Sequence, residues 1–320
     1  MPARFRRPRL LIVGCGDVGQ RMAQLLQAQS GAQGQRGVRV LALTSSPEKV
    51  PALRRLGVQP LLGNLDDARS LRRLQGVAHY VVHWAPPAAH GVQDGRTAAL
   101  LPALARGRAP RAVVYASTTG VYGDCQGQWI DETRAVQPTT DRARRRVDAE
   151  QRVRAWGLQT GTRVSVLRIP GIYAPDRAGG TPQARLRKGL PVLCAQDDVY
   201  TNHIHADDLA RAGWAAMWRG RAQRSYNVCD DSDLRMGEYF DVAADIYGLP
   251  RPPRSTRAQI AQHLSAAMLS FMGESRRLRN ARMRQELRVR LQWPTVQQGL
   301  RGGAASHPWP EHAVAVTAPR

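Results

Sequence analysis

Three glycines near the N-terminus have the spacing of a phosphate-binding turn. They form a GxGxxG pattern between the apolar run 10–13 and a segment of helical periodicity. In such a turn the first glycine permits a tight bend, the second lets the backbone approach a diphosphate, and the third lets the helix pack on the strand. The pattern predicts dinucleotide binding at the helix N-terminus, and a purely structural turn is the alternative. The expected contacts are Gly14, Cys15, Gly16, Asp17, Val18 and Gly19.

The end of the second apolar run bears on which dinucleotide binds. Sites that prefer NAD usually place an acidic residue there, where it binds both ribose hydroxyls. This chain has Thr44, Ser45 and Ser46 at that point, with Lys49 nearby. A 2′-phosphate would meet no acidic residue at the strand end, so we predict NADP, with NAD as the alternative. Serines that merely cap the helix begun by Pro47 would suit either cofactor.

The elements that must position these residues alternate along the first half of the chain. Short apolar runs predict strands, and segments of helical spacing lie between them. This alternation predicts an α/β, Rossmann-type doubly wound parallel sheet. The predicted strands are 10–13, 38–43, 59–62, 78–83, 112–116 and 164–169, and the predicted helices are 20–29, 47–56, 68–74, 97–106 and 141–156.

After about residue 170 the pattern loosens into loops rich in glycine and proline. Helical spacing returns at 206–218, 236–247, 257–272 and 275–286, which predicts a smaller, mostly helical C-terminal cap. We therefore expect a dinucleotide-binding domain at 1–170 and a substrate-binding cap at 171–301, partly interleaved with the sheet. A flexible tail is expected at 302–320.

Composition narrows the class of protein. The chain has 320 residues, 42% of them hydrophobic, which is ordinary for a globular protein. No apolar run approaches the roughly 18 residues of a membrane span, and Gly14 interrupts the N-terminal run too early for a secretory signal. We expect a cytoplasmic protein. The four cysteines lie far apart without metal-ligand spacing, so no metal site is expected.

The charge balance is strongly basic and is carried by arginine. Lysine and arginine number 47 against 25 acidic residues, a formal net charge of +22, and Lys49 and Lys188 are the two lysines. Arginine clusters at 4–9, 142–146 and 276–290 leave nucleic-acid binding as an alternative function. The use of arginine almost everywhere in place of lysine is typical of a genome-wide bias, and no nucleic-acid-binding motif is present.

Several further motifs occur in a recognisable order. They are Gly63-Asn64-Leu65-Asp66, the segment 82–86 that ends in Ala85-Pro86, the segment 114–123, the segment 167–175 and the segment 204–208. With the glycine loop, they make the chain resemble the NAD(P)-dependent epimerase/dehydratase family of extended and atypical short-chain dehydrogenase/reductases. The resemblance implies further cofactor contacts at Asn64, Leu65, Ala85, Pro86, Ser117, Pro170 and Gly171.

The resemblance also implies hydride transfer between nicotinamide and a substrate carbinol or carbonyl. In the family a Ser or Thr holds the substrate oxygen, and a Tyr exchanges its proton beside a Lys four residues later. Thr118 occupies the Ser/Thr position. Glu150 matches the acidic residue that usually follows the Lys by four residues, so counting back puts Arg146 at the Lys position and Arg142 at the Tyr position. A guanidinium stays protonated and has no proton to exchange. A substitute acid is therefore needed, with Tyr122 and Tyr173 as candidates and His83, His203 and His205 behind them.

These observations predict an NAD(P)-dependent oxidoreductase of atypical active site, with a small-molecule substrate between the sheet edge and the cap. The family's commonest substrates are nucleotide sugars. A non-catalytic NADP-binding sensor is the first alternative, and the arginine-rich nucleic-acid binder is the second. The expected substrate contacts are Thr118, Tyr173, Asp176, Arg177 and His203.

The helix predicted at 141–156 also bears on assembly. Extended members of the family often dimerise through this helix, but here it carries six arginines. A two-fold axis would oppose these charges to their own copies, so we predict a monomer or a different dimer interface. Arg142, Arg146 and Glu150 share one helical face, which is either an anion-binding stripe or a solvated charged surface.

Overall fold

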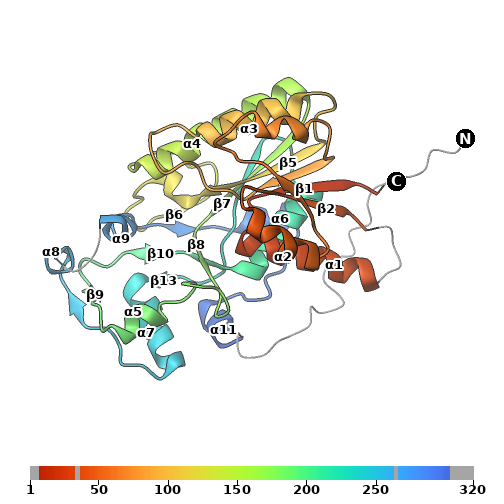
Figure 1. Cartoon of the computed structure of the whole chain (residues 1–320). Helices are drawn as coiled ribbons and strands as arrows, with labels where there is room; N and C mark the ends of the chain where they lie inside the picture. Colours follow the sequence, from red (N-terminus) through yellow and green to blue (C-terminus); the bar gives the residue numbers. More distant parts are fainter. Residues whose placement is uncertain (1–6, 33–36, 263–265, 303–320) are drawn as a thin grey trace, which may run out of the picture.

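The apolar runs of the N-terminal half form neighbouring strands of one seven-stranded parallel sheet (Figure 1). The computed structural model describes residues 7–32, 37–262 and 266–302. The predicted fold class is confirmed. Across the sheet the strands are β12 (Arg224–Asn227), β7 (Arg163–Ile169), β5 (Ala112–Thr118), β4 (Tyr80–His83), β1 (Arg9–Val13), β2 (Arg39–Thr44) and β3 (Gln59–Leu62).

The edge strand β12 was not among the predicted strands. Its sequence Arg-Ser-Tyr-Asn has one apolar residue, so it carries no hydrophobic signal of its own. Pairing with β7 in parallel register nevertheless buries Ser225 and Asn227. The strand exists because a neighbour supplies its backbone hydrogen bonds, and local sequence does not encode that neighbour.

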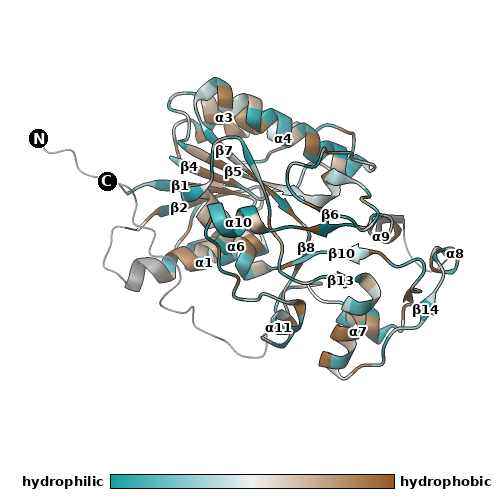
Figure 2. Cartoon of the chain, turned by 180° about the vertical axis from the view of Figure 1, so that it is seen from behind, coloured by the Kyte–Doolittle hydropathy of each residue, from teal (hydrophilic) through white to brown (hydrophobic). Residues whose placement is uncertain are grey.

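Helices cover both faces of the sheet, and alternate strand residues face each layer. Leu10 and Ile12 of β1 belong to a buried cluster with α1 (Asp17–Ala32) and α6 (Ala206–Arg219), whereas Leu11 and Val13 belong to a second cluster on the opposite face. That second face is covered by η2 (Ser70–Leu74), α3 (Gly95–Ala105) and α4 (Asp141–Thr160). Figure 2 shows the hydrophobic strands enclosed between these layers.

The helix boundaries follow local capping chemistry. The Asp94 side chain accepts hydrogen bonds from the backbone N–H groups of Arg96 and Thr97 at the start of α3. Thr140 caps α4 in the same way, and Gly161, with φ of +69°, ends it. The helix predicted at 47–56 is a short 3-10 turn, η1 (Pro47–Lys49), followed by α2 (Val50–Arg55).

The helix predicted at 275–286 is wrong in its first half. Residues Arg277–Leu278 form the short strand β15, which pairs with β6 (Trp129–Ile130), and the helix α10 covers only Ala281–Glu286. A partner strand some 150 residues away overrides the local helical spacing. The helix predicted at 257–272 comprises α8 (Arg257–Ile260) and α9 (Ala266–Phe271), and residues 263–265 lie outside the described residues.

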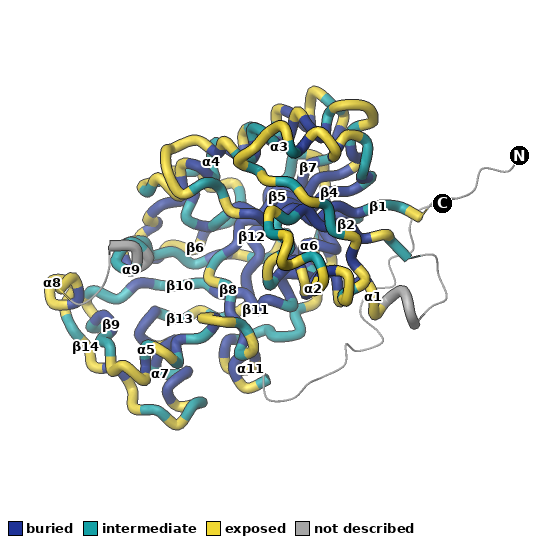
Figure 3. Tube along the Cα trace, viewed as in Figure 1, coloured by how far each residue is buried: buried dark blue, intermediate teal, exposed yellow. Residues whose placement is uncertain are grey.

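The cap has its own buried core, which includes Leu186, Val192, Phe240 and Leu300 (Figure 3). Its helices are α5 (Gln183–Arg187), α7 (Met236–Tyr247), α8, α9 and α11 (Val296–Arg301). Its short strands pair as β8 (Gly171–Tyr173) with β11 (His203–His205), β9 (Val192–Leu193) with β14 (Arg254–Ser255), and β10 (Tyr200–Thr201) with β13 (Leu234–Arg235).

The chain returns from the cap to the main sheet. The helix α6 packs against α1, and β12 extends the sheet beside β7. The division at residue 170 therefore stays a prediction, and the part 303–320 of the predicted tail lies outside the described residues. Among the described residues, no helix combines the length and the apolar character needed to cross a bilayer.

Candidate functional site

A cavity of about 300 Å³ lies at the carboxyl ends of β1, β5 and β7, where the glycine loop meets the first turn of α1. In a doubly wound sheet this edge is where ligands bind. The residues that line the cavity are Gly14, Gly16, Asp17, Val18, Gly19, Trp84, Ala116, Ser117, Thr118, Arg146, Ile169, Pro170, Ile172, Arg177 and Leu209.

The three glycines of the loop differ in their surroundings. Gly14 has φ of +87°, and a Cβ atom there would lie 2.5 Å from the backbone nitrogen of Ala85. A Cβ on Gly19 would lie 2.9 Å from the carbonyl oxygen of Gly14. At Gly16 no atom of the described residues, apart from its chain neighbours, lies within 4 Å of the Cβ position, so this residue faces open space in the cavity. A bound group therefore has room to approach the loop backbone at Gly16.

The first turn of α1 provides hydrogen-bond donors at this point. The carbonyl of Gly16 accepts the hydrogen bond from the N–H of Gln20 at 2.9 Å, so the N–H groups immediately before Gln20 belong to the unpaired first turn. Such groups favour a diphosphate. Arg177 also lines the cavity, with its Nε 3.1 Å from an Asp17 carboxylate oxygen and its Nη1 donating to the carbonyl of Ile172 at 2.8 Å.

A buried arginine ties this loop to the cap side of the site. The guanidinium of Arg21 binds the carboxylates of Asp17, Asp176 and Asp207 at 3.1, 2.7 and 2.6 Å. Burial disfavours ionisation of Asp176, but the hydrogen bond from Arg21 is decisive and lowers the pKa of that carboxyl. The ion pairs fix the segment that carries Asp176 and Arg177 against the phosphate loop.

Four of the predicted cofactor contacts, Asn64, Leu65, Ala85 and Pro86, follow neighbouring strands and lie outside the 300 Å³ cavity. The Arg96 guanidinium binds Asp66 at 2.6 Å and donates to the carbonyl of Pro86 at 3.2 Å, which ties the segment containing Asn64 and Leu65 to the segment containing Ala85 and Pro86. At the end of β2, Thr44 Oγ1 accepts a hydrogen bond from the N–H of Ser46 at 3.2 Å.

An acidic residue does stand close to the end of β2. The pKa of the exposed Glu48 carboxyl is lowered, first by its own backbone N–H and then by a hydrogen bond from Ser46. The Ser46 side chain makes no capping hydrogen bond to the helix backbone. A cofactor phosphate at this point would meet both Glu48 and Lys49.

The opposite end of the cavity is formed by Ser117, Thr118 and Arg146. Arg146 Nη1 donates to the carbonyl of Ala116 at 2.7 Å and to the hydroxyl of Tyr115 at 3.1 Å. Both bonds use one nitrogen, and a guanidinium carries five N–H donors, so Nε and Nη2 retain donors for a bound group. Thr118 Oγ1 accepts the N–H of Gly120 at 3.3 Å, which leaves its own hydroxyl proton for a ligand.

The structure does not bring the predicted substitute acids into this cavity. Tyr122 is 1% exposed and donates to Asn227 Oδ1 at 2.7 Å, and burial raises its pKa to about 12. Tyr173 donates to the carbonyl of Thr295 at 3.3 Å, and burial raises its pKa as well. His203 stacks on Tyr239 with 4.2 Å between ring centroids, and burial lowers its pKa to about 4.

The remaining candidates also lie outside the cavity lining. His83 is buried with its Nε2 3.1 Å from Thr97 Oγ1, and His205 accepts the N–H of Asp207. Burial lowers the pKa of each imidazole to about 4. Arg142 is exposed one turn before Arg146. In the described part of the chain, the cavity lining contains no tyrosine, histidine, lysine or cysteine, which are the usual proton-exchanging groups besides carboxylates.

Some lining residues were not among the predicted site residues. Trp84, Ile169, Ile172 and Leu209 form apolar parts of the wall. Trp84 falls inside the segment 82–86 that the sequence marks, but nothing in the sequence says that its side chain turns toward the cavity. Arg21, the centre of the ion pairs, carries only the signal of its i,i+4 spacing from Asp17.

The arginines of α4 are less exposed than the sequence suggested. Arg145, Arg146 and Arg154 donate to the backbone carbonyls of Gly91, Ala116 and Gln223. Two others form ion pairs within the helix: Arg144 with Asp141, and Arg152 with Asp148. The charge repulsion expected at this helix is thus smaller than six arginines imply, and the predicted monomer or different dimer interface stays a prediction. Nucleic-acid binding stays an alternative prediction.

The parallel sheet, the glycine loop at its first βα junction and the cavity at its carboxyl edge define a dinucleotide-binding protein of the Rossmann type. The profile of the NAD dependent epimerase/dehydratase family matches residues 10–229, and the chain belongs to this family. The resemblance predicted from the motifs is confirmed. Structural neighbours include a UDP-glucose 4-epimerase and a UDP-N-acetylglucosamine 4-epimerase.

Two proteins are similar to this chain over most of its length. Protein YeeZ of Escherichia coli K12 is 26% identical over 254 residues, which cover 76% of this chain and 85% of YeeZ. A structure described as a functionally unknown conserved protein from Silicibacter pomeroyi DSS is 30% identical, with a TM-score of 0.74 over 92% of this chain and 98% of that one.

A solved structure of lower sequence identity has the same fold as this chain. UDP-glucose 4-epimerase of Thermotoga maritima, solved with UDP-glucose, is 17% identical, with a TM-score of 0.74 over 92% of this chain and 96% of that one. Other neighbours of this kind were solved with NAD.

Proposed function

We propose that this protein binds NADP along the carboxyl edge of its sheet and acts as an oxidoreductase on a carbinol or carbonyl substrate. The observation that carries the proposal is the open space at Gly16, which faces a cavity that continues to Thr118 and Arg146. The N–H groups of the first turn of α1 and the Arg177 guanidinium would hold the diphosphate. Asn64, Leu65, Ala85 and Pro86 would surround the adenosine half, and Ser117, Pro170 and Gly171 the nicotinamide half.

The bound nicotinamide would supply or accept the hydride. Thr118 and Arg146 would donate hydrogen bonds to the substrate oxygen and stabilise negative charge that develops on it. Since a guanidinium does not release its proton, Arg146 acts by its charge. Water rather than a tyrosine would donate the proton in the reduction and accept it in the oxidation.

The substrate would lie between the sheet edge and the cap, with Thr118 and Arg177 the predicted contacts that line the cavity. We propose that residues 1–170, with α6 and β12, hold the dinucleotide, and that the rest of 171–301 covers the substrate. Nucleotide sugars are the first substrates to test, because neighbours of this fold bind UDP-glucose.

Fluorescence titration of the full chain with NADPH and NADH tests the binding step. Cofactor oxidation or reduction, measured with a panel of nucleotide sugars and small carbonyl compounds, tests the reaction. Saturable NADPH binding together with turnover of one substrate supports the proposal. A folded protein that binds neither cofactor overturns it.

The absence of a proton-exchanging tyrosine or lysine from the cavity lining, in the residues the structure describes, favours a second candidate. A non-catalytic sensor would keep the dinucleotide site without the proton-transfer pair. It predicts tight NADPH binding without cofactor turnover, and no deuterium incorporation from solvent into any substrate of the panel. The oxidoreductase proposal requires cofactor turnover, deuterium incorporation or both.

Replacing Arg146 by methionine is expected to separate the reaction from binding. The loss of one charged donor to a developing oxyanion lowers kcat by about 100-fold or more. The NADPH dissociation constant should change by less than about 10-fold, because Arg146 lies at the far end of the cavity from the phosphate loop. Steady-state kinetics and fluorescence titration measure the two effects. Equal losses in kcat and in NADPH affinity would show that Arg146 mainly holds the cofactor.

Aspartate at Ser45 is expected to reverse the cofactor preference. Ser45 is exposed at the end of β2, where a carboxylate accepts hydrogen bonds from ribose hydroxyls and repels a 2′-phosphate. The ratio of NADPH to NADH dissociation constants should rise by about 10-fold or more. Ser45→Asn is the matched control, because it has a similar shape without the charge. An unchanged ratio in Ser45→Asp would contradict the proposed NADP preference.

A further inference from the structure

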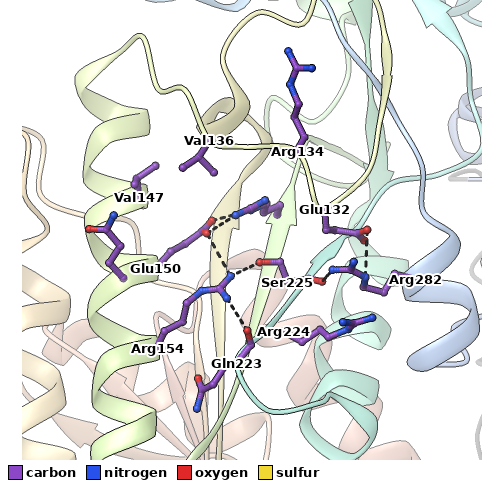
Figure 4. Close-up of a pocket in the computed structure, with 12 residues that line it drawn as sticks. Glu132, Arg134, Val136, Val147, Glu150, Arg154, Gln223, Arg224, Ser225 and Arg282 are labelled. Atoms are coloured by element: carbon purple, nitrogen blue, oxygen red, sulfur yellow. Dashed lines mark hydrogen bonds and ion pairs between the residues drawn. The ribbon is translucent and has the colours of Figure 1, made fainter.

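A second cavity, of about 390 Å³, lies at the outer edge of the sheet, away from the glycine loop. It is an open cavity bordered by α4, the strands β7 and β12, the segment around Glu132 and the helix α10 (Figure 4). None of its lining residues lines the dinucleotide cavity. Glu150 stands between the two cavities, because it lines this one and accepts a hydrogen bond at 2.6 Å from Ser117, which lines the other.

Arginines from four different elements converge on this second cavity. They are Arg154 of α4, Arg168 of β7, Arg224 of β12 and Arg282 of α10. In Figure 4 the guanidinium of Arg154 points toward Glu150, Ser225 and Gln223, whereas Arg134 points away from the group. Like charges from separate elements repel one another unless anions compensate them.

The acidic residues nearby each have an arginine partner. Glu150 accepts two hydrogen bonds from Arg168, at 2.8 and 3.2 Å, and Glu286 binds Arg224 at 2.9 Å. Glu132 lies 3.5 Å from Arg282. Arg154 lies farther from its nearest carboxylate, at 3.8 Å from Glu150, and its hydrogen bonds go to the neutral Gln223 carbonyl and Ser225 hydroxyl. Its charge is thus the least compensated of the four.

Two observations indicate that the positive charge is not fully satisfied. Arg168 is 5% exposed, and among the described residues its Nη1 has no hydrogen-bond partner. A buried unpaired donor on a charged group is costly, and its positive charge stabilises an anion in the adjoining cavity. Burial lowers the pKa of Arg154, and the positive charge of Arg168 contributes in the same direction, although Glu150 opposes it.

We propose that this cavity binds the phosphate group of a small phosphomonoester. Arginine forks bind phosphate oxygens, and a phosphate in the cavity would accept from Arg154, while the buried charge of Arg168 attracts it without direct contact. The volume of about 390 Å³ lies in the range of small-molecule sites and exceeds what a phosphate ion fills, so the rest of the cavity accommodates the group esterified to it. Val136 and Val147 supply an apolar part of the wall.

Isothermal titration calorimetry of the full chain with inorganic phosphate, at constant ionic strength, tests the site. Saturable binding with a Kd of about 1 mM or below is expected. Ribose 5-phosphate should bind more tightly, because its sugar fills the remaining volume. Tighter binding of inorganic phosphate than of ribose 5-phosphate would contradict the phosphomonoester, and a titration without saturable heat would overturn the site.

Variants show which of the two cavities holds the phosphate detected by calorimetry. Arg154→Gln and Arg224→Gln change side chains that are 31% and 36% exposed, so the fold should tolerate them. Arg154→Gln should weaken phosphate binding by about 10-fold, the effect of one charged contact, and Arg224→Gln should weaken it less, because Glu286 already compensates Arg224. Gly16→Trp, which fills the dinucleotide cavity, should not weaken it. Arg251→Gln, at an exposed ion pair elsewhere, is the matched control. Binding that is lost in Gly16→Trp and kept in both arginine variants would overturn the proposal.

Discussion

A tryptophan in place of Gly16 is expected to abolish dinucleotide binding while the protein stays folded. Among the described residues other than its chain neighbours, no atom lies within 4 Å of the Cβ position of Gly16, and its φ is not in the left-handed region, so a Cβ there meets no clash and no backbone strain. The indole would occupy the space that the loop leaves for a diphosphate. We expect the NADPH dissociation constant to rise by about 100-fold or more, equivalent to about 2.7 kcal/mol.

Fluorescence titration measures this loss, and thermal unfolding monitors the fold. Gly95→Trp is the matched control, because Gly95 is exposed at the start of α3 and also has no atom within 4 Å of its Cβ position. It should bind NADPH as the unmodified protein does. A Gly16→Trp protein that unfolds normally and still binds NADPH with unchanged affinity would show that the dinucleotide does not bind at this loop.

Leucine at Glu150 is expected to cause the largest loss of stability of any single change considered. Glu150 is 4% exposed and Arg168 is 5% exposed, and the two form a bidentate ion pair. Removing one partner of a buried pair leaves an uncompensated charge, which costs about 3–5 kcal/mol of unfolding free energy. Ser117 would lose its hydrogen-bond acceptor in the same step.

Urea denaturation measures this free energy. The double variant Glu150→Leu/Arg168→Met removes both charges and should recover much of the loss, because an apolar pair of similar volume avoids the desolvation penalty. Asp245→Asn, at the exposed Asp245 and Arg251 pair, is the surface control and should change the stability by less than about 1 kcal/mol. A double variant less stable than Glu150→Leu would contradict this explanation.

The catalytic residues expected from the sequence show the limit of motif reasoning. Tyr122, Tyr173 and His203 lie close to strand ends, which made them candidates for proton exchange. In the structure each is held by a partner distant in the chain, namely Asn227, Thr295 and Tyr239. A sequence motif places a backbone at the sheet edge, but these long-range contacts decide where the side chain points.

The sequence by itself determined the sheet, the family and the phosphate loop. Those features depend on short-range properties: the apolar periodicity of strands such as 10–13 and 164–169, the capping residues of α3 and α4, and the missing Cβ of Gly14 and Gly16. Each is encoded within a few neighbouring residues, so it can be recognised without knowing the fold.

Only the tertiary structure decided the edge strand β12, the strand β15 and the partners of the arginines. The sequence does not say whether a guanidinium on α4 meets solvent, a carboxylate or a backbone carbonyl. Its choice depends on which groups the fold brings within hydrogen-bond distance, as with Arg146 at Ala116 and Arg154 at Gln223. The second cavity exists for the same reason, because its arginines and carboxylates lie up to 150 residues apart in the chain and meet only when the sheet is complete.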